Sequence, residues 1–340
     1  MQTEYIGLYV ELTSACNLRC RHCYNASGCK SVELDYRILS RVIRQMAKDN
    51  VKNIALSGGE PILYSHFWDV LDLCASLNIR TSVITNGTLW NREMIEKIEA
   101  YDVFIQVSLD GMEENHDYVR GNGAFQKVIG TLDLFGSSKL KDRINIHCVI
   151  NNRNYDEMQE IIQLCNSKGA ASLSFNMYNK LGRACEESEI QFPDDKSRIE
   201  TIDLINKVVD ANKDIQQIMK ITGAPTTHFC PLLEDTPKFN LRIDSEGNVY
   251  PCQIFSGIQY SLGNIYSQTI NEIIHSERTE MFHDFIKMTT EFNSECVKCA
   301  FKKSCGKGCP GARLADNSLN DVDDNCYQIK KEFFKAIMEA

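Results

Sequence analysis

Short apolar runs alternate with amphipathic segments from residue 5 to about residue 176. The apolar runs predict six strands, at Ile6–Leu12, Asn53–Ser57, Thr81–Thr85, Val103–Ser108, Asn145–Ile150 and Ser172–Asn176. Segments with helical spacing lie between them, at Asp35–Lys48, His66–Leu77, Arg92–Tyr101, Ala124–Leu134 and Tyr155–Lys168. Strands that alternate with helices of roughly ten or more residues indicate βαβ units and a parallel sheet. We therefore expect an α/β fold, a partial (β/α)6 barrel of the TIM type.

The alternation stops after Asn176. A polar stretch leads to a long predicted helix at Lys196–Ile221, and Gly223 and Pro225 mark a boundary. We expect a first domain over residues 1–225 and a smaller, cysteine-rich domain over residues 226–340. The smaller domain contains a predicted hairpin (Asn240–Ile243 and Val249-Tyr250) and predicted helices at Thr269–Phe285 and Tyr327–Ala340. Because its apolar periodicity is weak, we expect bound metal to supply part of its folding energy.

Glycine and polar residues follow the predicted strands where each strand ends. Cys16, Gly58-Gly59, Asn86-Gly87 and Asp110-Gly111 all have this position. The carboxyl ends of parallel strands meet at one edge, and folds of this class build their sites there. The sequence therefore predicts one shared site at this edge.

Composition and charge exclude several classes of protein. The chain has 340 residues, 43% of them hydrophobic and 24% charged, with a formal net charge of -9. This charge argues against nucleic-acid binding, which needs a basic surface. No signal peptide is visible at the N-terminus, and no window approaches the roughly 18 consecutive apolar residues of a membrane span. We expect a cytoplasmic protein.

The fifteen cysteines are more than an ordinary protein of this length contains. In a reducing compartment, clustered cysteines indicate metal ligands or catalytic thiols rather than disulfides. Four lie between Cys16 and Cys29, and seven lie between Cys230 and Cys326. Of the others, Cys74, Cys148 and Cys165 fall in strand or helix patterns and are expected to be small buried hydrophobic residues. The role of Cys29 stays open.

The first cluster of cysteines has the spacing C-x3-C-x2-C, formed by Cys16, Cys20 and Cys23. Three thiolates on a short loop can hold three irons of a [4Fe–4S] cubane and leave the fourth iron without a protein ligand. An open coordination position is typical of metal sites that perform chemistry. The alternative is structural zinc, for which His22 is the candidate fourth ligand.

This motif, placed after a first strand and with His22 in the aromatic position before the third cysteine, resembles the radical S-adenosylmethionine (SAM) superfamily. The resemblance implies that the open iron binds the amino and carboxylate groups of SAM. Ser57-Gly58-Gly59-Glu60-Pro61 is similar to the motif that contacts the methionyl amino group in that superfamily. A glycine pair lets the backbone approach a ligand closely.

Ser108 and Arg120 resemble the pair that holds the SAM carboxylate in this superfamily. An arginine suits a carboxylate because its planar fork donates two parallel hydrogen bonds. The alternative for Arg120 is a surface ion pair with Glu113 or Glu114. The resemblance implies reductive cleavage of SAM to methionine and a 5′-deoxyadenosyl radical, which abstracts hydrogen from the substrate. An external one-electron reductant of the flavodoxin or ferredoxin type is implied as a partner.

The later cysteines resemble the SPASM extension of some radical SAM enzymes, which carries two auxiliary [4Fe–4S] clusters; structural zinc is the alternative. By that resemblance the inner cluster is held by Cys230, Cys252 and Cys309. The outer cluster is held by Cys296, Cys299, Cys305 and Cys326. The chain departs from the family pattern in that no second cysteine lies near Cys230, and the gap from Cys230 to Gly247 is slightly long. The inner cluster therefore has an open iron, which we favour, or Cys185 completes it.

The resemblance implies a peptide or protein substrate, and we expect maturation of a ribosomally made peptide by crosslinking or epimerisation. Sulfatase-maturing members have an aspartate base where this chain has Gln253, which cannot serve as a base at neutral pH. Protein side chains and small cofactor precursors remain alternatives. So do two proteins that are not enzymes: a zinc-binding interaction protein and an iron–sulfur electron carrier. Since the first strand starts within about six residues, we expect no fused peptide-recognition domain, so leader recognition needs a separate leader-binding protein or the barrel surface. Tyr24 and Glu60 lie near the expected cavity, but the sequence assigns the role of general base to neither.

Overall fold

The computed structural model describes residues 4–216, 220–222, 230–291, 294–301 and 309–311, together with residues 326, 330 and 338. The chain divides into two compact units. One consists of Tyr9–Ala224 and Asp244–Glu246, and the other of Met1–Leu8, Pro225–Ile243 and Gly247–Ala340. Across the described residues, no helix is both long and apolar enough to cross a membrane.

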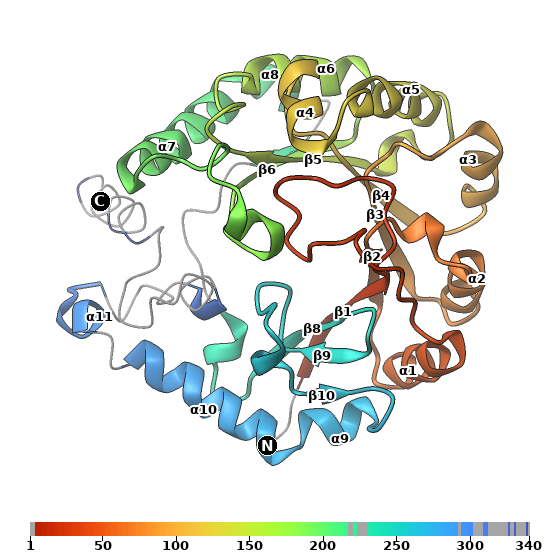
Figure 1. The fold of residues 1–340 in the computed structure, drawn as a ribbon, viewed down its shortest axis with the longest axis vertical. Coiled ribbons are helices and arrows are strands. Elements are labelled where there is room, and N and C mark those ends of the chain that lie inside the picture. The colour runs from red at the N-terminus through yellow and green to blue at the C-terminus, as the bar shows by residue number, and fades with distance from the viewer. Residues whose placement is uncertain are drawn as a thin grey trace. The chain divides into compact units, whose positions relative to one another are not determined.

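Strands and helices alternate in the unit that begins at Tyr9 (Figure 1). The strands are β1 (Glu4–Thr13), β2 (Asn53–Gly58), β3 (Arg80–Thr85), β4 (Val103–Ser108), β5 (Ile144–Ile150), β6 (Ser172–Met177) and β7 (Lys220–Thr222). They are ordered in the sheet as in the chain, and the pairs from β2 to β7 are all parallel. The expected parallel α/β sheet is confirmed.

The helices of this unit follow the strands and cover one face of the sheet (Figure 1). They are α1 (Tyr36–Lys48), α2 (Phe67–Ser76), α3 (Arg92–Ile98), α4 (Glu113–Arg120), α5 (Ala124–Gly136), α6 (Met158–Ser167), α7 (Asp195–Ala211) and α8 (Lys213–Gln216). Helix α4 was not expected from the sequence. Its buried residues are His116, Val119 and Arg120, so two of the three are polar and give no apolar period.

The two faces of the sheet differ in polarity. Positions that face the helices are apolar and completely buried, as Ile105, Ile146 and Phe175 show. The alternate positions of β5 are only half-buried. On β4, β5 and β6 most of these positions carry amide, hydroxyl and imidazole side chains: Gln106, Asn145, His147, Ser172, Ser174 and Asn176. Phe104 and Val149 are apolar exceptions. Parallel sheets are usually apolar on both faces, so this polar face needs a functional explanation.

The helix expected at Lys196–Ile221 ends earlier than its pattern indicates. Helix α7 stops at Ala211, and residues Lys220–Thr222 form β7, which pairs in parallel with β6. Asn212 ends the helix because its amide donates to the carbonyl oxygen of Val208 (2.7 Å) and exchanges hydrogen bonds with the amide of Gln159. An asparagine that bonds back to the helix in this way stabilises a helix end.

Among its described residues, the second unit contains an antiparallel meander followed by helices. Strands β8 (Lys238–Ile243), β9 (Asn248–Tyr250) and β10 (Gly263–Asn264) pair in this order, which confirms the expected hairpin. The helices are α9 (Ile270–Ile274), α10 (Glu277–Glu291) and α11 (Ser294–Lys298). The helix expected at Thr269–Phe285 is therefore two helices. The Ser276 hydroxyl accepts from the Thr279 amide (3.2 Å) and starts the second one. Most of the expected final helix, Tyr327–Ala340, lies outside the described residues.

Candidate active site

The three N-terminal cysteines lie on a closed loop after β1. At the base of the loop, the Ser14 amide donates to the carbonyl oxygen of Val32 (2.8 Å) and the Leu34 amide to that of Leu12 (3.0 Å). Farther along, the Gly28 amide donates to the Ser14 carbonyl oxygen (2.8 Å). The loop therefore leaves the sheet and returns to it at one point. We call residues 14–34 the cysteine loop.

Each of the three thiols has a polar neighbour. The Cys16 sulfur accepts from the Leu18 amide (3.4 Å) and from Asn86 Nδ2 (3.9 Å). The Cys20 sulfur lies 3.9 Å from Arg120 Nη1, and Cys23 donates to Asn25 Oδ1 (3.0 Å).

Burial governs the ionisation of these thiols. Burial raises the pKa of Cys16, and it raises the pKa of Cys20 to about 11, although the Arg120 guanidinium opposes the second shift. A metal that binds such thiols displaces their protons. Cys16 and Cys20 are therefore thiolates once they bind a metal.

Gly58 and Gly59 bring the end of β2 against the cysteine loop. The Gly59 amide donates to the Thr13 carbonyl oxygen (2.7 Å), and the Glu60 amide donates to that of Ala15 (2.9 Å). A Cβ on Gly59 would lie 2.1 Å from the Ala15 carbonyl oxygen. Gly58 has φ +122°, a conformation that favours glycine, and a Cβ there would lie 2.4 Å from the Thr13 carbonyl oxygen. Both positions require glycine because backbone packs on backbone.

The Glu60 side chain is completely buried and supports the loop after β3. Its two oxygens accept from the Thr85 hydroxyl (2.7 Å) and the Asn86 amide (2.8 Å). Thr85 Oγ1 already accepts from the Gly87 amide and from Trp90 Nε1, so its own hydrogen points to Glu60. Burial raises the pKa of Glu60 to about 7, and the donors from Thr85 and Asn86 act in the opposite direction.

Replacing Glu60 by glutamine is expected to destabilise the protein by about 1–3 kcal/mol. Both acceptor positions face donors, so the new amide N–H has no acceptor in either orientation. Urea unfolding of the apoprotein at pH 8 measures the loss. The control is Glu96→Gln on the exposed face of α3, which is expected to change stability by less than about 0.5 kcal/mol. Equal stabilities of the two variants would contradict this account of the Glu60 carboxylate.

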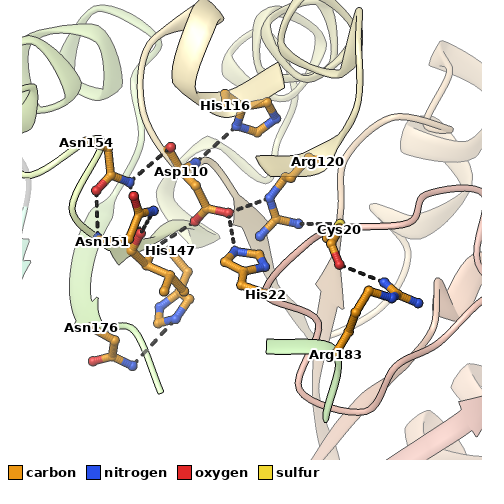
Figure 2. Close-up of polar contacts among 11 residues, drawn as sticks. Cys20, His22, Asp110, His116, Arg120, His147, Asn151, Asn154, Asn176 and Arg183 are labelled. Carbon is orange, nitrogen blue, oxygen red and sulfur yellow. Dashed lines mark hydrogen bonds and ion pairs between the residues drawn. The ribbon is translucent and has the colours of Figure 1, made fainter. Parts of the chain in front are cut away.

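Asp110, just after β4, is a buried centre of charge (Figure 2). Its Oδ2 lies 2.6 Å from Arg120 Nε and 2.7 Å from His22 Nε2, and its Oδ1 accepts from the Val149 amide (2.8 Å). Burial acts to raise the pKa of Asp110, but Arg120 and His22 hold this pKa well below its usual range. Asp110 is therefore an ionised carboxylate. The surface ion pair considered for Arg120 is wrong, because Arg120 is buried and pairs with Asp110.

Arg183 holds the cysteine loop from the opposite side (Figure 2). It belongs to the short 3-10 helix Gly182–Glu186 after β6, and its guanidinium donates to the carbonyl oxygens of Cys20 (2.7 Å) and Ser27 (2.8 Å). Its backbone amide donates to the Cys23 carbonyl oxygen (2.9 Å). Sequence reasoning missed Arg183. A Gly-Arg pair shortly after a predicted strand was the available signal, but backbone carbonyls as partners leave no trace in a sequence.

Replacing Arg183 by methionine is expected to loosen the cysteine loop by about 1–3 kcal/mol, because two loop carbonyls lose their donors. The readout is the iron retained after anaerobic reconstitution and desalting, which is expected to fall below the wild-type content. Arg92→Met is the control because Arg92 is exposed at the start of α3. Full iron retention in the Arg183 variant would show that the loop holds its shape without these hydrogen bonds.

The second unit brings some of its cysteines onto neighbouring elements. Cys230 precedes the 3-10 helix Pro231–Leu233, which lies against β8, and Cys252 follows β9, the partner of β8. Gly311, two residues after Cys309, packs against Ile254 and Phe255. Cys296 and Cys299 are linked by a hydrogen bond from the Cys299 amide to the Cys296 carbonyl oxygen (3.2 Å). Cys305 lies outside the described residues, and Cys326 is described without its sequence neighbours.

The residues present fit an iron–sulfur cluster with bound SAM. Three half-buried or buried thiols share one loop, and no other cysteine thiol contacts them in the described interactions. His22, the candidate zinc ligand, directs Nε2 to Asp110, and its buried Nδ1 has no protein partner among the described residues. Arg120 Nη2 likewise has no acceptor there. His22 and Arg120 both contact Asp110, and Arg120 also contacts Cys20 (Figure 2), so their remaining nitrogens can offer polar contacts to a molecule bound at the cysteine loop.

Comparison with known proteins assigns the class. Residues 10–165 match the family model of the radical SAM superfamily, and residues 230–300 match SPASM, the iron-sulfur cluster-binding domain. The chain belongs to the radical SAM superfamily and carries a SPASM domain. It is an enzyme, and its cofactors are SAM and iron–sulfur clusters.

Among its relatives is the mycofactocin maturase MftC of Mycolicibacterium smegmatis, 26% identical over 95% of this chain and 83% of the relative. The cysteine-type anaerobic sulfatase-maturating enzyme of Clostridium perfringens is also 26% identical, over 95% of this chain and 93% of the relative. The solved structure of anSMEcpe with bound AdoMet and the Cp18Cys peptide has a TM-score of 0.76 and 22% identity. It covers 98% of this chain and 97% of that chain, and shows that the two share a fold.

Proposed function

We propose that this enzyme matures a ribosomally made peptide by hydrogen abstraction, forming a crosslink or inverting a stereocentre. The polar face of the sheet carries the proposal. In register, Gln106 neighbours Asn145 and Asn145 neighbours Ser172, while His147 neighbours Ser174 on the next row. These side chains are neutral donors and acceptors, as peptide amides are. The face carries no lysine or arginine from β4, β5 or β6, which a phosphorylated or acidic substrate would need.

The relatives support a substrate of this class. MftC and the sulfatase-maturating enzyme are maturases by name, and the similar solved structure holds a peptide together with AdoMet. A small cofactor precursor gives no reason for an amide-rich face that runs across three strands. Protein side-chain oxidation of the sulfatase type is the second candidate because of the relative from Clostridium perfringens. Gln253 stands against it, since a carboxamide cannot accept the proton of a substrate thiol or hydroxyl.

In this proposal Cys16, Cys20 and Cys23 hold the cluster that binds SAM. Arg120 and Ser108, a buried hydroxyl at the end of β4, bind the SAM carboxylate. The backbone at Gly58-Gly59 approaches the methionyl amino group, and Glu60 holds the adjoining loop. When bound, the cluster and SAM supply radical initiation. The protein residues bind and orient SAM beside the cluster.

The auxiliary cysteines of the SPASM domain divide as the family pattern implies. Cys230, Cys252 and Cys309 hold the inner cluster, and Cys296, Cys299, Cys305 and Cys326 hold the outer one. The packing of Gly311 against Ile254 and Phe255 supports the first set, because it brings the segments of Cys309 and Cys252 together. An external one-electron reductant completes the proposed system.

The deciding experiment incubates anaerobically reconstituted enzyme with SAM, dithionite and the short peptide encoded beside its gene. A crosslink lowers the peptide mass by two hydrogens, and an epimerisation in D2O replaces one hydrogen by deuterium, so the mass rises by the difference between these two isotopes. Asn145→Leu is expected to lower peptide turnover about tenfold or more while SAM cleavage without peptide is retained. An unchanged peptide together with active SAM cleavage would refute the peptide substrate but not the enzyme class.

A further inference from the structure

The Asp110 carboxylate is immobile because every polar atom of the residue is bonded. Besides the contacts to Arg120, His22 and Val149, its backbone amide donates to His116 Nδ1 (3.0 Å). Its carbonyl oxygen accepts from Asn154 Nδ2 (3.1 Å). Burial lowers the pKa of His116 to about 4, so this imidazole is neutral and accepts through Nδ1. Groups bonded to Asp110 therefore take their orientation from it.

The first such group is Arg120, whose guanidinium is held by Asp110 at one edge. Nε bonds to Asp110 Oδ2, and Nη1 is directed at the Cys20 sulfur. Nη2 has no acceptor among the described residues. The guanidinium thus presents N–H donors next to Cys20 of the cysteine loop (Figure 2). A planar guanidinium held at one edge can rotate little, so the direction of the free edge is set before any ligand arrives.

The second group is His22, between Cys20 and Cys23. Its Nε2 faces the ionised Asp110 carboxylate at 2.7 Å, so Nε2 carries the hydrogen. The His22 side chain is 8% exposed, and Nδ1 has no protein partner among the described residues. A buried polar nitrogen without a partner is costly unless a ligand or water supplies one.

We propose that Asp110 is a positioning residue for SAM, because it fixes the direction of both Arg120 and His22. Arg120 offers donors to the carboxylate of SAM, and His22 Nδ1 offers a polar contact to the same molecule. A single carboxylate therefore orients both contacts before the molecule binds. This inference rests on the proposed function only in the site of SAM binding, and it does not depend on the peptide.

Asp110→Asn tests the inference. The asparagine keeps the shape and can accept from Val149, but its amide N–H faces the donors of Arg120 and His22, so both lose their orientation. We expect SAM to bind about 10–100-fold more weakly, the usual effect of removing a partner that orients a ligand. The probe is SAM itself, titrated into the reduced enzyme while its effect on the electron paramagnetic resonance spectrum of the cluster is followed. The iron content and the spectrum without SAM are expected to stay as in the wild type.

Asp102→Asn is the matched control. Asp102 precedes β4 at its other end, and it too has two arginine partners, Arg80 and Arg143, but it is exposed. SAM binding by this variant is expected to equal that of the wild type. Asp110→Asn with an intact cluster and wild-type SAM affinity would overturn the inference.

If Asp110→Asn does not fold, His22→Phe replaces it, because this change keeps a planar ring and the Asp110–Arg120 pair while it removes Nδ1 together with the Nε2 hydrogen bond to Asp110. Several-fold weaker SAM binding by an intact cluster then supports the inference, and unchanged binding overturns it. If the wild-type spectrum itself did not respond to SAM, the proposed SAM site would fail first, before any variant is compared.

Discussion

Cys20→Ser is expected to abolish SAM cleavage, so that 5′-deoxyadenosine formation falls by more than about 100-fold. This loss is larger than the usual effect of removing a residue that surrounds a metal site. Cys20 is the most buried of the four cysteines on the cysteine loop and contacts Arg120. A serine hydroxyl is a poor ligand for iron, so the cubane loses one of only three protein ligands. Reconstituted protein is expected to contain about four fewer irons per chain, measured by iron and sulfide analysis.

Cys29→Ser is the control for this result, since Cys29 lies on the same loop and is exposed. It is expected to keep its iron and its activity. If both serine variants lost iron equally, the cluster would depend on the whole loop rather than on the C-x3-C-x2-C set. If neither did, the assignment of the cluster to this loop would be wrong.

Gly59→Ala is expected to lower the free energy of unfolding by about 3 kcal/mol. The new Cβ would lie 2.1 Å from the Ala15 carbonyl oxygen and 2.6 Å from its carbon. Both atoms are backbone, so relief requires β2 and the cysteine loop to separate. Thermal unfolding of the apoprotein measures the loss, at roughly 2–4 °C for each kcal/mol in a domain of this size. Because the displaced backbone leads directly into Cys16, iron incorporation is expected to fall as well.

Gly130→Ala is the counterpart. Gly130 lies inside α5, and a Cβ there would meet nothing within 4 Å. This variant is expected to be more stable than the wild type by roughly 0.5–1 kcal/mol, since alanine favours helix more than glycine does. A Gly59 variant as stable as this one would show that the loop and β2 move apart freely.

The sequence predicts the fold because its short apolar runs alternate regularly with helices that have clear periods. It also predicts the shared edge, because Cys16, Gly58 and Asp110 each follow a strand. Helix α4 and β7 escaped prediction for physical reasons: α4 buries His116 and Arg120 in place of apolar residues, and β7 has three residues.

The partners within the site could not be read from the sequence. Asp110-Gly111 has the form of an ordinary turn, and only the structure brings its carboxylate to Arg120 and His22. Arg183 acts on backbone carbonyls more than 150 residues away, and the carbonyl of one residue is like that of any other. A sequence thus shows which residues are candidate ligands. The groups that orient these residues are identified only from tertiary contacts.

The contacts of Arg183 also fix an order of events during synthesis. Cys29 and Arg183 are 154 residues apart, so the cysteine loop leaves the ribosome long before its last clamp exists. At 5–20 residues per second the delay is on the order of 10 s. For the first part of this interval, until residue 120 has been made, the three thiols lack Arg120 as well as Arg183. Cluster insertion into the finished loop is therefore a late step, and the nascent thiols must be kept reduced until β6 and the segment that follows it have been made.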